Sequence, residues 1–158
     1  MKFKDLYNEH YKLIYSIVFR FIHNKEETED ICQETFLKLY EYISNGKEIN
    51  NVKSWLITLS LNNCKDKYKK QTKYRFIKDH VHSSKLQYSD PDSMYEINEK
   101  AQILSSAIDQ MPQKEKEMLI LYQEGMSYKE IGEICNVNYT SVGKTLSRVI
   151  LKLKKKSI

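Results

Sequence analysis

The stretch SYKEIGEICNVN, at residues 127–138, decides the fold of the second half of the chain. Ser127 is followed three residues later by Glu130, a capping-box pattern that predicts the start of a helix. Two isoleucines continue that short helix on one face. The Asn-Val-Asn sequence that follows predicts a tight turn, after which Asn138 can cap a second helix.

The helix after the turn has two different faces. Its apolar stripe consists of Val142, Leu146, Val149 and Leu153. A short capped helix, a tight turn and a longer two-faced helix are typical of a helix-turn-helix, whose second helix enters the major groove of DNA. Leu151 does not fit, because it falls on the polar face. The candidate DNA-binding residues on or beside that polar face are Thr140, Ser141, Lys144, Thr145, Arg148 and Lys152.

The rest of the chain also shows helical periodicity, with apolar residues at steps of three and four. Pro112 is expected at the first position of a helix, where a missing N–H does no harm, and Gly125 at its C-terminal end. Trp55 lies on an apolar stripe and is expected in the core. The tyrosines at 7, 11 and 15 are expected in the core or at its rim. The expected upstream helices cover residues 3–22, 24–43, 51–75 and 94–108.

The composition predicts an all-α fold. The 158 residues include only 4 glycines and 2 prolines, too few for a turn-rich sandwich or barrel. We expect two small helical bundles, at 1–75 and 94–158, joined by a flexible linker at 76–93. The sequence shows no apolar run of membrane-spanning length, no signal-peptide layout, and three scattered cysteines that fit buried reduced thiols. We therefore expect a cytoplasmic protein.

The net charge of +5 is unevenly distributed along the chain. Residues 51–75 carry seven Lys or Arg against one acid, and residues 151–158 carry four Lys and no acid. The other segments have a slight excess of acid. Two basic islands of this kind indicate two surfaces that face a polyanion. Solvated lysine-rich helix ends are the alternative interpretation.

Three stretches of the chain carry a family resemblance: TEDICQETFLKLY at 28–40, VKSWLITLSLNNCKD at 52–66 and DQMPQKEKEMLILYQEGMSYKEIGEICNVNYTSVGKTLSRV at 109–149. Together they resemble the sigma factors of bacterial RNA polymerase, and among them the extracytoplasmic-function (ECF) class, which keeps only regions two and four. The resemblance implies a protein that binds core RNA polymerase, recognises two promoter elements and helps to melt the downstream one. It implies core polymerase and promoter DNA as partners, and an anti-sigma factor as a further partner of the family.

The resemblance also implies roles for residues in the first half. The helix that contains Glu29 is expected to dock on the clamp helices of the polymerase's largest subunit, and the second half on the flap of the second-largest subunit. Acids near a helix start also complement the helix dipole. This alternative explains Glu26, Glu27 and Glu29, but Gln33 and Glu34 lie too far along the helix. The residues expected to bind polymerase are Glu29, Asp30, Gln33, Glu34 and Leu37.

The loop at 44–53 corresponds to the family's segment that captures a flipped base of the minus-ten promoter element. Amide side chains can pair with such an exposed base edge, and Asn45 and Lys47 are candidates beside the residues given below. Two positions depart from the family: Leu61 replaces a basic residue, and Gly143 stands where recognition helices often carry arginine or lysine. Close approach of the backbone to DNA is one hypothesis for that glycine. The DNA-binding residues expected in the first half are Asn50, Asn51, Asn62, Lys65, Lys69 and Lys70.

Two other functions compete with this interpretation. A polymerase-independent regulator would use the helix-turn-helix on a palindromic operator, but it gives no reason for the basic run at 65–75. An enzyme such as a nuclease would need clustered metal ligands or a nucleophile with its base, and the sequence shows neither. His80 and His82 have no further ligand nearby in the sequence, so we expect exposed linker histidines. We expect no enzymatic activity, no metal and no cofactor.

Overall fold

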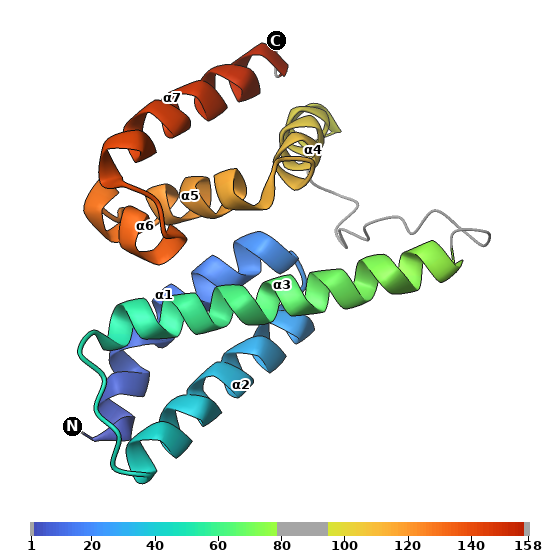
Figure 1. The fold of residues 1–158 in the computed structure, drawn as a ribbon. Helices are drawn as coiled ribbons and strands as arrows, with labels where there is room; N and C mark the ends of the chain where they lie inside the picture. The colour runs from blue at the N-terminus through green and yellow to red at the C-terminus, as the bar shows by residue number, and fades with distance from the viewer. Residues whose placement is uncertain (1, 79–94, 157–158) are drawn as a thin grey trace. The chain divides into compact units, whose positions relative to one another are not determined.

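The computed structural model describes residues 2–78 and 95–156, and within them the side chains of 2–69 and 99–156 (Figure 1). The described chain consists of helices without a strand, which confirms the expected all-α class. It divides into two compact units, Met1–Ile77 and Lys78–Ile158. The helices are α1 (Phe3–Ile22), α2 (Lys25–Ser44), α3 (Val52–Lys78), α4 (Tyr95–Asp109), α5 (Gln113–Gln123), α6 (Tyr128–Cys135) and α7 (Tyr139–Lys156).

Asparagine side chains cap the starts of α2 and α3. The Asn24 side chain accepts the N–H of Glu27 at 3.0 Å to begin α2. Asn51 accepts the N–H of Ser54 at 3.1 Å and so begins α3. At α5 the expectation is wrong by one residue, because Pro112 has an extended ψ of 139° and is the N-cap. Its carbonyl accepts the first helical bond, from the N–H of Lys116 at 3.1 Å.

The first unit has a core to which α1, α2 and α3 all contribute. Thr28, Thr35 and Ser60 lie inside it, and each hydroxyl donates to a backbone carbonyl of its own helix or of the residue that caps the helix. The Thr28 hydroxyl donates to the carbonyl of Asn24 at 2.6 Å, and the Thr35 hydroxyl to Ile31 at 2.8 Å. The buried apolar residues are Leu6, Ile14, Ile17, Val18, Phe21, Ile31, Cys32, Phe36, Leu39, Leu56, Ile57, Leu61 and Cys64.

The tyrosines of α1 lie at the rim of this core. Successive rings of Tyr7, Tyr11 and Tyr15 stand 5.0 and 6.1 Å apart, in a row that is half-buried at 11 and 15. Ile17 and Phe21 are buried instead, so the core stripe of α1 is rotated from the one the tyrosines suggest. At this rim Phe36 of α2 meets the Tyr7 ring edge-on, with the ring centroids 4.9 Å apart, and Tyr7 is 37% exposed.

In the second unit, α7 packs against α4, α5 and α6. The predicted stripe is confirmed, since Val142, Leu146 and Val149 are buried and Leu153 is half-buried. In α4, Ala107 is buried but Leu104 is 39% exposed, so this helix is less covered than α7. The expected helix at 94–108 begins at Met94, which lies outside the described residues. The predicted linker at 76–93 overlaps the last turn of α3, which continues to Lys78.

Candidate nucleic-acid interface

The helix-turn-helix is formed by α6 and α7, with the turn at residues 136–138 between them (Figure 1). Ser127 caps α6 by accepting the N–H of Glu130 at 3.2 Å, and its hydroxyl donates to the Glu130 carboxylate at 3.2 Å. Asn136 ends α6 in the left-handed region, with φ of 56°. The Asn138 side chain accepts the N–H of Thr140 at 3.2 Å and so caps α7. Local hydrogen bonds therefore define both helices of the motif.

Gly132 sets how closely the turn approaches α6. A Cβ at this position would stand 2.8 Å from the Val137 carbonyl oxygen and 3.2 Å from the Tyr139 nitrogen. Both neighbours are backbone atoms, and the Val137 N–H donates to the Gly132 carbonyl at 3.0 Å. Only glycine fits such a close approach without moving the turn. The sequence patterns did not indicate this residue, although a glycine inside an eight-residue helix was a usable signal.

The polar face of α7 is exposed as the sequence predicts, at Thr140, Ser141, Lys144, Arg148 and Lys152; Thr145 is half-buried. The hydroxyls at 140 and 141 serve the cap, because both donate to Asn138, at 3.1 Å to its side chain and 2.8 Å to its carbonyl. These hydroxyls keep only lone pairs for DNA. The hydrogen-bond donors that this part of the helix presents are therefore chiefly Lys144 and Arg148.

Arg148 makes an ion pair across the unit. Its Nη2 stands 3.3 Å from Oε1 of Glu115 in α5. The arginine side chain is 61% exposed and the glutamate side chain 16% exposed. The arginine is thus tied at one nitrogen while most of its surface faces solvent. No sequence pattern links these two residues, which are 33 positions apart.

Gly143 lies under the ring of Tyr128, the first residue of α6. A Cβ at 143 would stand 3.1 Å from a ring carbon of that tyrosine, which is 45% exposed. A large side chain at 143 would displace the ring. Gly143 therefore leaves room for the Tyr128 ring, which is a structural explanation for the glycine besides the hypothesis of close approach to DNA. Leu151, the misfit on the polar face, is indeed 57% exposed.

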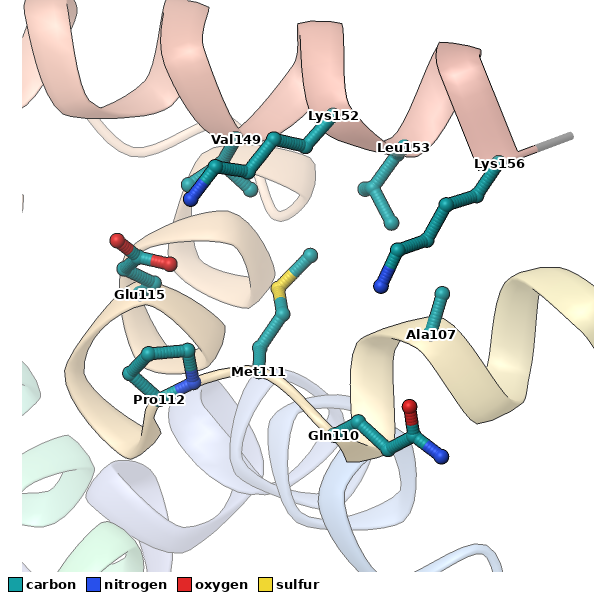
Figure 2. Close-up of a pocket in the computed structure, with 9 residues that line it drawn as sticks. All are labelled: Ala107, Gln110, Met111, Pro112, Glu115, Val149, Lys152, Leu153 and Lys156. Carbon is teal, nitrogen blue, oxygen red and sulfur yellow. The ribbon is translucent and has the colours of Figure 1, made fainter.

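A cavity of about 120 Å³ lies beside the C-terminal half of α7, where that helix faces the end of α4 and the start of α5. Figure 2 shows Met111 and Leu153 pointing into it, with the lysines at 152 and 156 reaching across from α7. Glu115 lines it as well, so the ion pair with Arg148 lies at its edge. The cavity combines apolar walls with cationic side chains.

The loop between α2 and α3 rests on an aromatic pair. The Tyr42 and Trp55 rings stand 5.3 Å apart, and the Lys47 ammonium lies 5.0 Å above the Tyr42 ring. Trp55 is half-buried under this loop rather than deep in the core. Asn50 and Asn51 are exposed, but the Asn51 side-chain oxygen is occupied by the cap of α3, which leaves its NH₂ group to meet a ligand.

The basic side of α3 faces outward where it is described. Asn62 and Lys69 are exposed and Lys65 is half-buried. The side chain of Lys70 lies outside the described residues. Leu61, which replaces the family's basic residue, is 3% exposed and belongs to the core. An apolar side chain therefore suits this position.

The residues expected to bind polymerase share the outer face of α2. Asp30, Gln33 and Glu34 are exposed, Glu29 is half-buried, and Leu37 is 58% exposed. The opposite face of the same helix is buried. There, burial and, to a smaller extent, the nearby charge of Glu29 together raise the pKa of the Cys32 thiol to about 12. Leu37 is therefore an exposed apolar side chain among polar ones on the outer face of α2.

The part of the chain that the structure describes contains neither a metal-binding cluster nor a membrane-spanning helix. Among residues 2–78 and 95–156 no group of three or more His, Cys, Asp or Glu is placed to hold a metal ion. Within the same ranges, no helix combines the length and apolar character needed to cross a membrane.

Comparison with known proteins gives each unit a counterpart. Residues 6–74 match the family model for Sigma-70 region 2, and residues 101–153 match the model for Sigma-70, region 4. The chain is 29% identical to the RNA polymerase sigma factor YlaC of Bacillus subtilis (strain 168), over 96% of this chain and 90% of that protein. It is 26% identical to the ECF RNA polymerase sigma factor SigM of the same organism, over 98% of this chain and 94% of that protein.

Solved structures show the same fold. The sigma factor RpoE in complex with the anti-sigma factor NepR from Bartonella quintana matches with a TM-score of 0.68 and 21% identity, over 97% of this chain and 96% of that one. CnrH in complex with the cytosolic domain of CnrY matches with a TM-score of 0.67 and 18% identity, over 97% and 85%.

A region 2 unit followed by a region 4 unit with a helix-turn-helix is the architecture of a transcription initiation factor of the sigma-70 type. The chain belongs to the ECF group of RNA polymerase sigma factors. It directs promoter-specific initiation of transcription, as the sequence resemblance implied.

Proposed function

We propose that the two units divide the work of initiation. The first unit holds core polymerase with the outer face of α2 and captures the minus-ten element with the loop at 45–51 and the basic side of α3. The second unit reads the minus-thirty-five element with α7. The observation that carries this proposal is the separation of surfaces: the acidic face of α2, the amide-bearing loop and the cationic face of α7 are all exposed, while their opposite sides form the cores.

Each surface suits its assigned ligand chemically. The NH₂ group of Asn51 and the exposed Asn50 can pair with the edge of an unstacked base. Lys69 is placed to neutralise phosphates of the same strand. On α7, Lys144 and Arg148 can donate to acceptors in the major groove, where guanine offers two. The exposed Leu37 gives the α2 face an apolar anchor for a protein partner.

Partners and setting follow from the relatives. We propose that the cavity beside α7 helps to receive the flap of the polymerase's second-largest subunit, because it offers apolar walls on the unit that binds upstream DNA. An anti-sigma factor is a further proposed partner, since the two solved structures named above are complexes, one with the anti-sigma factor NepR and one with the cytosolic domain of CnrY. We also propose that the chain acts in the cytoplasm and carries out no covalent chemistry itself.

Run-off transcription with purified core polymerase tests the proposal. Specific initiation should appear only when the chain is added, and Lys144→Glu should abolish promoter selection while the chain still binds core polymerase. Leu37→Asp should do the reverse and weaken polymerase binding. Lys12→Glu, at an exposed position of α1, is the matched charge control and should change neither. If the purified chain instead binds a palindromic duplex tightly without polymerase, the division of work is wrong.

A further inference from the structure

The ion pair between Glu115 and Arg148 joins a helix outside the helix-turn-helix to the proposed reading face. Glu115 is the third residue of α5, and its carboxylate reaches Nη2 of Arg148 at 3.3 Å. Arginine carries five N–H donors in a planar fork, so one anchored nitrogen leaves others for a ligand. Anchoring also removes much of the rotamer freedom of a long side chain, and a pre-oriented donor discriminates better than a mobile one.

Folding stability alone is a poor reason for this pair. The arginine side chain is 61% exposed, and ion pairs with that exposure contribute little to stability because water and salt screen them. The carboxylate even carries a cost for function, since a negative charge beside a DNA-reading helix repels phosphates. Glu115 and Lys152 both line the cavity, and Figure 2 shows the Lys152 side chain reaching from α7 toward the side where Glu115 lies. The acid is therefore placed among the cations of α7.

We propose that Glu115 is a positioning residue for promoter selectivity. It holds the Arg148 guanidinium in the orientation that reads one base pair of the minus-thirty-five element, and it keeps that cation from settling on phosphates at non-promoter sequences. This rests on the proposed role of Arg148 as a base-reading residue. The consequence is a trade in which the holoenzyme has weaker general DNA binding and sharper discrimination at one position.

The experiment uses holoenzyme assembled with wild type, Glu115→Gln, Arg148→Ala or Glu133→Gln. Each is bound to a promoter series with every single substitution in the minus-thirty-five element and to non-promoter duplex, at several salt concentrations. Arg148→Ala identifies the base pair that Arg148 reads. At that base pair, Glu115→Gln should lose at least about fivefold of discrimination, the lower end of what one good side-chain contact provides. Its binding to non-promoter DNA should tighten, with a salt slope steeper by up to about 0.9 for one added phosphate contact.

Glu133→Gln is the matched control, because it removes one negative charge from an exposed position of α6 in the same unit. It should leave the discrimination and the salt slope unchanged. Arg148→Lys keeps the charge and removes the fork while the sequence of α5 stays unchanged, so it should reproduce the loss of discrimination even if Glu115→Gln lowers the stability of the unit.

Three outcomes are distinguishable. If Arg148→Ala loses discrimination at one base pair and Glu115→Gln keeps it, the positioning role is wrong and the proposed function stands. If Arg148→Ala leaves every base pair equally discriminated, the proposed role of Arg148 itself fails. If Glu115→Gln weakens all sequences equally and lowers the unfolding temperature of the unit, the pair has only a structural role and the inference is overturned.

Discussion

Replacing Gly132 with alanine should destabilise the second unit, although alanine is the better helix former. The added Cβ would stand 2.8 Å from the Val137 carbonyl oxygen and 3.3 Å from the Tyr139 Cα. Forcing an extra carbon into a packed site costs about 1–3 kcal/mol, and the upper part of that range applies where the neighbours are backbone. The higher helix propensity of alanine offsets up to about 1 kcal/mol of that cost. The free energy of unfolding should therefore fall by about 1–2 kcal/mol.

Calorimetry and circular dichroism on the full chain can measure this change. For a domain of this size, about 1 kcal/mol corresponds to a shift of about 4–8 °C in the unfolding midpoint. The second unit should therefore melt roughly 4–16 °C earlier than in the wild type. Trp55, the only tryptophan, belongs to the first unit and reports on it separately, so the transition seen by its fluorescence should not move.

Gly143→Ala is the matched control for this prediction. Its Cβ meets a ring carbon of Tyr128 at 3.1 Å, and that side chain is 45% exposed and can rotate. The second unit should keep its midpoint or gain up to about 1 kcal/mol from helix propensity. If Gly132→Ala is as stable as Gly143→Ala, the close approach of the turn to α6 is not the constraint that the distances indicate.

Three further predictions concern caps and a buried thiol. Ser127→Ala should cost the second unit about 1 kcal/mol by removing the cap of α6, as thermal unfolding would show, and an unchanged midpoint would contradict the capping role. Asn51→Ser should keep the cap of α3 and the stability of the first unit but lose base preference at the minus-ten element in transcription assays, whereas Asn51→Ala should lose both. The raised pKa of Cys32, about 12, should leave this thiol unreactive toward iodoacetamide in the folded protein at pH 8; rapid labelling would show that the site opens. Because the unfolded chain releases this proton first, stability should fall as the pH rises from about 9 toward 12, which equilibrium unfolding can follow.

Features that depend on near neighbours in the sequence were predictable. Asn24, Asn51, Ser127 and Asn138 each cap a helix through an atom two or three residues away, so the pattern alone contains the geometry. The apolar stripe of α7 was equally readable, because it is regular and its helix packs against three others. Most candidate residues of the DNA and polymerase surfaces lie exposed where the structure describes them, and their roles remain predictions.

Features that depend on distant neighbours were not predictable. Tyr7, Tyr11 and Tyr15 repeat at helical spacing, which predicted the core or its rim, but the spacing alone could not decide between the two, and their ring contacts with Phe36 of α2 belong to the tertiary fold. Gly132 is needed because a turn folds back on it, and Glu115 meets Arg148 across 33 residues. In each case the deciding contact joins residues that are distant in the sequence. Periodicity predicts which side of a helix is apolar, but it does not predict which atoms of other helices pack against that side.

The pair of Glu115 and Arg148 also fits how such a factor is delivered to DNA. Because both units are carried to the promoter on one polymerase, the second DNA contact is made at a high effective concentration, and neither unit needs strong DNA affinity of its own. Under that condition a carboxylate that weakens phosphate binding costs little, while any gain in orientation of the arginine is kept in full. A free-standing repressor, which must find its operator unaided, would lose more from the same acid. The acid beside the recognition helix is therefore better suited to a tethered factor than to an independent regulator.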